Sequence, residues 1–217
     1  MKLRNLAAAT LAVFAFAAPE GSKADPITFE SLGDQTTFHY GGTVDGANLC
    51  ADVTYTLASW AGSSAIFNVS ATNCSGGAGS TLNPNRLVSF AIGIVNPDLV
   101  SAVVPGVSEW DAVTDANFPS AGTVDLCSYA GATCSGGSSL GVFMGATDIF
   151  DVTLSLASAV GASNPITFDG SFFSKWQSVG LSGSGFTATN QVPEPATLGL
   201  LALGFAGFAI VVRRRRD

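Results

Sequence analysis

The chain has 217 residues and a formal net charge of −7, from 16 acidic and nine basic side chains. Seven of the basic residues lie near the two ends, so residues 25–194 hold 14 acidic side chains against Arg86 and Lys175, a net charge of −12. A domain this acidic repels the phosphates of nucleic acid and of anionic lipid headgroups. We therefore expect neither nucleic acid nor an anionic membrane surface as its partner.

The first 24 residues have the pattern of a secretory signal peptide. Lys2 and Arg4 precede an apolar run of 13 residues, 6–18, which is too short to span a bilayer. Small side chains at Ser22 and Ala24 favour cleavage after Ala24. The pattern predicts export through the Sec machinery.

Residues 25–180 are predicted to form one all-β domain. Valine, threonine, serine, phenylalanine and glycine dominate, and no internal segment keeps a helical apolar period over three turns. Eight or so short strands separated by turn residues favour an antiparallel β-sandwich of jelly-roll or immunoglobulin-like layout. Strands are expected at residues 25–29, 36–44, 49–60, 65–72, 86–95, 148–156 and 166–176.

Two further segments of this region are predicted to lack regular structure. Residues 105–123 contain two prolines and two glycines, and we expect a long surface loop anchored by Trp110 and Phe118. Residues 181–191 are rich in serine, glycine and threonine and are expected to be a flexible linker.

The four cysteines are expected to form two disulfides. Cys50 and Cys74 lie at the open end of a predicted hairpin, and a turn centred on residue 62 places them opposite each other, as a disulfide requires. Export to an oxidising compartment permits the bond. This pairing leaves Cys127 with Cys134, around a six-residue loop. A four-cysteine metal site is the alternative, but the chain has no Cys-x-x-Cys pair, and we expect no metal and no cofactor.

The sequence offers no catalytic motif of a common hydrolase or nucleotide-binding enzyme. The single histidine, His39, lies in a strand pattern, where a surface or structural role is expected. Trp110 lies between Glu109 and Asp111 and is a candidate platform for stacking on a sugar ring. We expect a protein that is not an enzyme. The alternative is a secreted carbohydrate-active enzyme or sugar-binding module that uses a pair of aspartates and an exposed tryptophan.

The last 26 residues consist of three consecutive parts. A short proline-rich motif comes first: Val192, Pro193, Glu194 and Pro195. Residues 196–212 are uncharged, and a helix of this length is about 26 Å long, close to the thickness of a bilayer core. A basic cluster follows and is expected to stay in the cytoplasm, with the upstream domain outside: Arg213, Arg214, Arg215 and Arg216.

These three parts closely resemble the PEP-CTERM sorting signal of Gram-negative bacteria, over about a tenth of the chain. The resemblance implies transient anchoring in the inner membrane and recognition by an exosortase, a multi-pass transpeptidase that cuts near the motif. Proteins with this signal accompany exopolysaccharide and biofilm production. The resemblance therefore implies a structural or adhesive protein of the cell surface or extracellular matrix, with extracellular polysaccharide as a partner. A tail anchor that is never cut is the alternative.

The central part of the chain also resembles the cistern subgroup of PEP-CTERM proteins. The similar segments are residues 67–73, 124–127, 134–137 and 175–178. This resemblance implies that the cysteine pair 127–134 belongs to the pattern of the subgroup.

Overall fold

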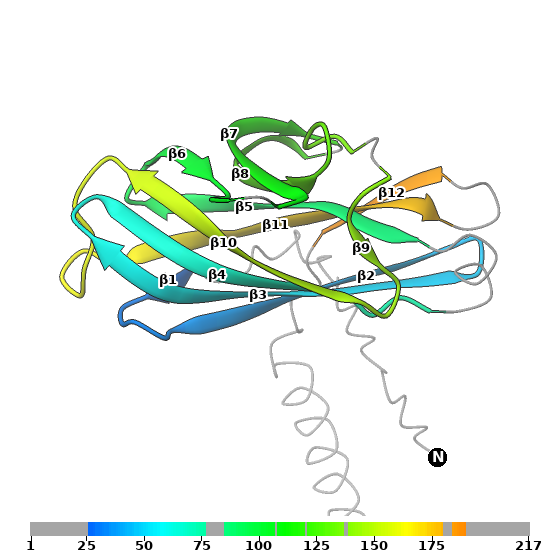
Figure 1. The fold of residues 1–217 in the computed structure, drawn as a ribbon, viewed down its shortest axis with the longest axis horizontal. Coiled ribbons are helices and arrows are strands. Elements are labelled where there is room, and N and C mark those ends of the chain that lie inside the picture. The colour runs from blue at the N-terminus through cyan, green and yellow to red at the C-terminus, as the bar shows by residue number, and fades with distance from the viewer. Residues whose placement is uncertain are drawn as a thin grey trace, which may run out of the picture.

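The computed structural model describes residues 26–76, 85–106, 108–119, 121–136, 139–179 and 184–189. The regular elements in these ranges are β-strands, arranged in two antiparallel sheets that pack face to face (Figure 1). The predicted all-β sandwich is confirmed. Among the residues described, no helix is long and apolar enough to cross a bilayer. The predicted signal peptide, 1–24, and transmembrane helix, 196–212, lie outside the described residues.

One sheet has five strands and is built mainly from consecutive segments of the chain. Its strands β2, β3 and β4 follow one another as hairpins, and β10 and β6 complete the sheet. In spatial order the strands are β2 (Gln35–Val44), β3 (Ala47–Ala61), β4 (Ser64–Asn73), β10 (Thr147–Leu156) and β6 (Leu99–Val103).

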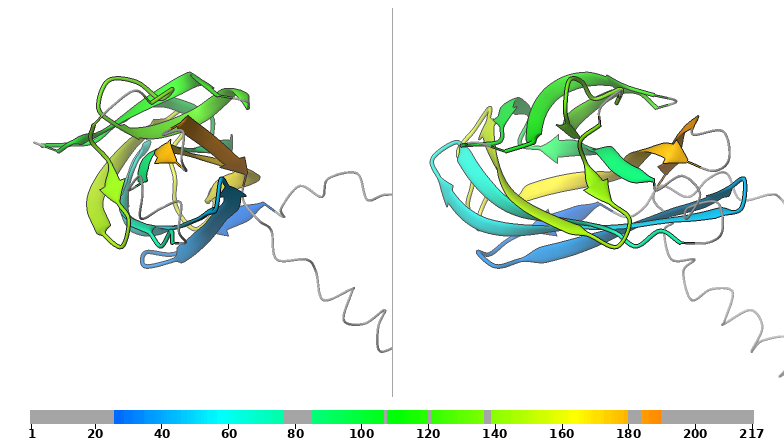
Figure 2. Two further views of the ribbon diagram at one scale, coloured as in Figure 1. Left: turned by 90° about the vertical axis from the view of Figure 1, so that its right-hand side faces the viewer. Right: turned by 45° about the vertical axis from the view of Figure 1, so that its right-hand side comes forward.

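The other sheet has seven strands and mixes distant segments. Its path is β1 (Ile27–Phe29), β11 (Ile166–Val179), β5 (Arg86–Asn96), β8 (Gly122–Ala130) and β7 (Trp110–Phe118). Two short strands extend it, with β12 (Ser184–Thr189) on β11 and β9 (Val142–Phe143) on β5. Seen from one end, the two sheets curve around a common interior (Figure 2).

The inner faces of both sheets are aromatic and aliphatic. Alternate residues of β3 from Ala47 to Leu57 are buried, as the predicted period of two requires. The rings of Phe38 and Phe172, from opposite sheets, stack with their centroids 3.7 Å apart. Tyr55 packs edge-on against rings from both sheets. Contacts of this kind hold the two layers together.

The prediction of a surface loop at 105–123 is wrong in part. Residues 110–118 form β7, and β8 begins at Gly122, so most of the segment is a β-hairpin. Trp110 and Phe118, predicted as anchors, are 4% and 0% exposed. Small and polar residues between these two gave a weak strand pattern. Pairing with β8 makes the segment a strand.

The prediction of a flexible linker at 181–191 is also wrong in part. Ser184–Thr189 form β12, which pairs antiparallel with β11 between Phe173 and Val179. Serine, glycine and threonine are typical of flexible linkers. The segment is instead ordered by the edge of β11, which its own composition does not reveal.

Candidate functional site

The outward face of the five-stranded sheet is polar and is a candidate binding surface. Alternate residues of β2, β3, β4 and β10 point away from the core, and most of them are threonine, serine, asparagine or aspartate. Side chains on neighbouring strands hydrogen bond across this face: Thr37 with Thr54 at 2.7 Å, His39 with Asp52 at 2.7 Å, Asn68 with Asp151 at 3.1 Å and Thr72 with Thr147 at 2.8 Å. The rows of pairs make a surface of hydroxyl, amide and carboxylate groups.

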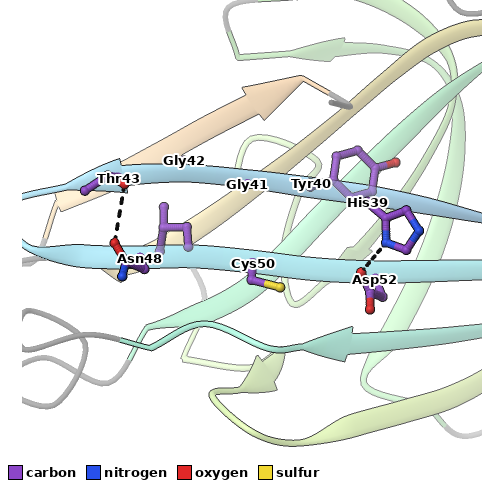
Figure 3. A pocket seen from close by; sticks show the side chains of 9 residues that line it. His39, Tyr40, Gly41, Gly42, Thr43, Asn48, Cys50 and Asp52 are labelled. Atoms are coloured by element: carbon purple, nitrogen blue, oxygen red, sulfur yellow. Dashed lines mark hydrogen bonds and ion pairs between the residues drawn. The ribbon is translucent and has the colours of Figure 1, made fainter. Parts of the chain in front are cut away.

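A groove of about 400 Å³ runs along the β2–β3 hairpin on this side of the molecule (Figure 3). Gly41 and Gly42 have no side chains to fill it. The His39–Asp52 pair stands at one end, and at the other end the hydroxyl of Thr43 donates to Asn48 Oδ1 over 3.4 Å. The groove is thus open, with polar side chains at both ends and ionisable groups at one of them.

His39 lies on the surface, as the sequence predicted. Its side chain is 62% exposed, and Nδ1 lies 2.7 Å from Oδ1 of Asp52, which is 42% exposed. The two residues face each other because β2 and β3 are paired in register at this position. A contact this exposed contributes little to stability. The two side chains matter mainly because they line one end of the groove.

Trp110 does not form a platform for a sugar ring, so this prediction is wrong. The indole is 4% exposed and stacks on Phe150 with ring centroids 4.9 Å apart and planes within 9° of parallel. Its Nε1–H donates to Asp148 Oδ2 over 3.0 Å. The ring also contacts Phe90 and its N–H is hydrogen-bonded, so the ring is not free to stack on a sugar. The aromatic residue next to Glu109 anchors the hairpin instead.

Glu109 and Asp148 place two carboxyl groups beside this tryptophan. Partial burial, with Asp148 as the second cause, raises the pKa of Glu109 above its ordinary value. Two neighbouring carboxylates repel each other when both are ionised, so the protonated form of Glu109 is favoured.

Two other aspartates line a cavity of about 180 Å³ on the seven-stranded sheet: Asp125 and Asp169. Asp125 Oδ2 accepts a hydrogen bond from the Ile94 amide at 2.7 Å, and Asp169 Oδ1 accepts one from the Ser171 amide at 2.7 Å. Both carboxylates thus satisfy backbone donors around an irregular part of the β5–β11 ladder.

Both predicted disulfides are present, Cys50–Cys74 and Cys127–Cys134. A regular hairpin without a bulge would not have brought Cys50 opposite Cys74. Next to the turn, Ala61 pairs with Ser64, and this register would set Cys50 opposite Ser75. A one-residue bulge between Leu57 and Ser59 shifts the ladder and brings Cys50 opposite Cys74.

One group of three possible metal ligands occurs among the described residues, Cys50, Asp52 and Cys74. The two cysteines are bonded to each other, so neither offers the thiolate that binds zinc or copper. Because all four cysteines are in disulfides, they do not form the alternative four-cysteine metal site.

The sorting residues predicted at the C-terminus lie outside the described residues. They are Val192, Pro193, Glu194 and Pro195, with the basic cluster at 213–216. A comparison with family models matches residues 191–216 to the PEP-CTERM protein-sorting motif. No curated protein and no solved structure matches the chain. The match confirms the predicted sorting signal and indicates an exported protein that is targeted to an exosortase. The similarity to the cistern subgroup stays a prediction.

Proposed function

Because the chain carries a PEP-CTERM protein-sorting motif, we propose that it is a non-catalytic structural or adhesive component of the cell surface or extracellular matrix. Its partner in this proposal is extracellular polysaccharide. The Sec machinery exports the chain, the inner membrane holds its C-terminal helix for a time, and an exosortase then removes the tail.

The observation that carries this proposal is the position of the motif directly after the folded domain. The last described strand ends at Thr189, and the matched segment begins two residues later, at residue 191. Cutting near Pro193–Pro195 removes the apolar run and the four arginines together. The product is a β-sandwich with two disulfides and a net charge close to −12, which suits a protein that stays in solution or in a hydrated matrix.

The outward face of the five-stranded sheet supports polysaccharide as the partner. Its hydroxyl and amide groups can donate to and accept from sugar hydroxyls. The strong negative charge of the domain disfavours polymers rich in uronate or sulfate, because like charges repel across the interface. A neutral polysaccharide is therefore the best match to this face.

Intact mass of the exported protein, with and without reductant, tests the sorting part of the proposal. We expect a chain that begins at Asp25, ends near residues 192–195 and gains four hydrogens on reduction. A product that still contains Arg213–Arg216 would contradict processing by an exosortase.

Co-sedimentation with a neutral glucan tests the adhesive part. The double variant Thr37→Val with Thr54→Val removes two hydroxyls of the polar face and keeps the β-branched shape that strands favour. We expect affinity to fall about tenfold, since each lost hydrogen bond is worth about 0.5–1.5 kcal/mol.

The matched control is Thr28→Val with Thr167→Val, an exposed hydroxyl pair across β1 and β11 of the other sheet, which is expected to bind like the wild type. Equal loss in both variants would contradict a role for the polar face. Release of reducing sugars by the wild type would contradict the non-catalytic role and favour the enzyme.

A further inference from the structure

The two disulfides differ in their exposure to solvent. Cys127 and Cys134 are 0% and 6% exposed and lie in a small hydrophobic cluster with Phe118. Cys74 is exposed and Cys50 is partly exposed. Exchange with an external thiol requires that an attacking thiolate reach one of the bonded sulfur atoms. The Cys50–Cys74 bridge allows this approach, and the Cys127–Cys134 bridge is covered.

The groove along the β2–β3 hairpin adds to this access. Cys50 lines the groove, and its neighbour across the ladder is Gly41, which has no side chain to cover the bridge (Figure 3). A bulky side chain at this place would stand beside the sulfur atoms, because directly opposite residues of a sheet lie close together.

The two cysteines are also held together independently of their sulfur–sulfur bond. The amide of Cys74 donates to the carbonyl of Cys50 over 3.0 Å. The hydroxyl of Ser75 accepts from the Cys50 amide at 3.0 Å and donates to the Cys50 carbonyl at 3.2 Å. None of these bonds involves a sulfur atom, so we expect them to keep the two thiols close together after reduction. Closure of the bridge is then an intramolecular reaction between held groups, which favours reversibility.

We propose that Cys50–Cys74 is a thiol–disulfide exchange site for an external thiol, whereas Cys127–Cys134 is a permanent structural bridge. The external thiolate attacks Sγ of Cys74 and forms a mixed disulfide with it. The Cys50–Cys74 bond breaks, its electron pair leaves on Sγ of Cys50, and that sulfur takes a proton from water. Attack by Cys50 on Cys74 reverses the step. A second external thiolate instead releases the oxidised thiol as its own disulfide and leaves the protein dithiol.

The charge around the bridge selects the class of thiol. A carboxylate oxygen of Asp52 lies within 4.8 Å of both sulfur atoms, and the processed domain has a net charge near −12. Both features repel an anionic thiol and attract a cationic one. The site therefore suits a neutral or cationic small thiol, or a cysteine in a basic segment of another protein.

Limited exchange on the oxidised, exported protein tests this proposal. The protein is treated with cysteamine, quenched with an alkylating reagent and mapped by mass spectrometry. We expect Cys50 and Cys74 to react at least about tenfold faster than Cys127 and Cys134, which should react only after denaturation. At equal thiolate concentration and low salt, we expect cysteamine to react about three- to tenfold faster than glutathione. Equal rates at the two bridges, or faster reaction at Cys127–Cys134, would overturn the proposal.

Two single variants identify the attacked sulfur. Each variant leaves one free thiol, which is treated with cystamine, the disulfide of cysteamine. In Cys50→Ser the Cys74 thiolate attacks cystamine, cysteamine leaves, and the mixed disulfide on Cys74 accumulates because no Cys50 thiol can displace it. Cys74→Ser leaves the less exposed Cys50, which should form the mixed disulfide several-fold more slowly. The reverse order would place the attack on Cys50 and contradict the step as written. Because the assay contains no polysaccharide, its failure and the failure of the proposed adhesive role are separate results.

Discussion

At the scale of single residues, Glu109 shows how position changes the chemistry of an ordinary side chain. It precedes Trp110, whose burial brings the Glu109 carboxyl beside Asp148. Partial burial and then the Asp148 carboxylate raise the pKa of Glu109. Nothing in the sequence around Glu109 indicates this, because Asp148 is almost forty residues away and belongs to the other sheet.

This shift has a consequence for the pH dependence of stability. A carboxyl group whose folded pKa is raised contributes stability below its unfolded pKa, about 4.3, and loses that contribution as pH rises through the folded pKa. We expect the free energy of unfolding of the wild type, relative to Glu109→Gln, to fall between pH 4 and pH 7. The change should stay below about 1 kcal/mol because the side chain is exposed. Urea unfolding of both proteins at the two pH values measures it, and a constant difference would contradict the shift.

At the scale of elements, the ladder between β5 and β11 is interrupted where the acidic cavity lies. Phe168 pairs with Ile94 and Phe172 with Ile92, so three residues of β11 bulge out opposite Gly93. Gly170, in this bulge, has a positive φ of 58°, which glycine adopts without strain. The bulge turns the carboxylate of Asp169 onto Gly93. The absence of a side chain at Gly93 therefore leaves room for the carboxylate of Asp169.

Gly93→Ala tests this packing. A Cβ atom at residue 93 would lie 2.3 Å from Oδ1 of Asp169, which is closer than atoms can approach. We expect a loss of about 1–3 kcal/mol in the free energy of unfolding, as for other overpacked sites. Gly161→Ala is the matched control, since a Cβ there meets nothing within 4 Å. Chemical denaturation compares them, and equal stability of the two variants would show that the carboxylate can move aside.

At the scale of the whole molecule, the important boundary is the one between the domain and its sorting signal. With β12 included, the seven-stranded sheet reaches Thr189, and the sorting motif begins at Val192. The predicted linker of 11 residues is therefore reduced to a very short connection. In the proposed anchored state, six residues, 190–195, separate Thr189 from the apolar run, and they span at most about 22 Å, so the folded sandwich would stay near the membrane surface.

Truncation tests where the domain ends. A protein that ends at Val179 lacks β12 and exposes the edge of β11 between Phe173 and Val179. We expect it to unfold at a temperature roughly 4–8 °C lower than a protein that ends at Thr189, for about 2 kcal/mol of lost pairing. The exposed edge should also promote self-association. Thermal unfolding and light scattering measure the two effects. Equal unfolding temperatures and equal light scattering of the two proteins would instead support the predicted flexible linker at 181–191.

The sequence by itself determined features that depend on local pattern. Period-two alternation located β3, β4 and β10, because a buried face imposes its own spacing on a strand. The sorting signal was equally readable, since motif, apolar run and arginines are contiguous. Both disulfides were also predicted, although the first depends on a bulge that the pattern did not reveal.

Only the tertiary structure decided the features that depend on a distant partner. β7 and β12 are strands because β8 and β11 supply their hydrogen-bonding edges, while their own residues are typical of loops. Trp110 became a core residue because Phe90 and Phe150 enclose it. The two disulfides differ in reactivity in our proposal because one lies in a hydrophobic cluster and the other beside an open groove. Spacing along the chain carries no information about which side chains will cover a given atom, so these results required the fold.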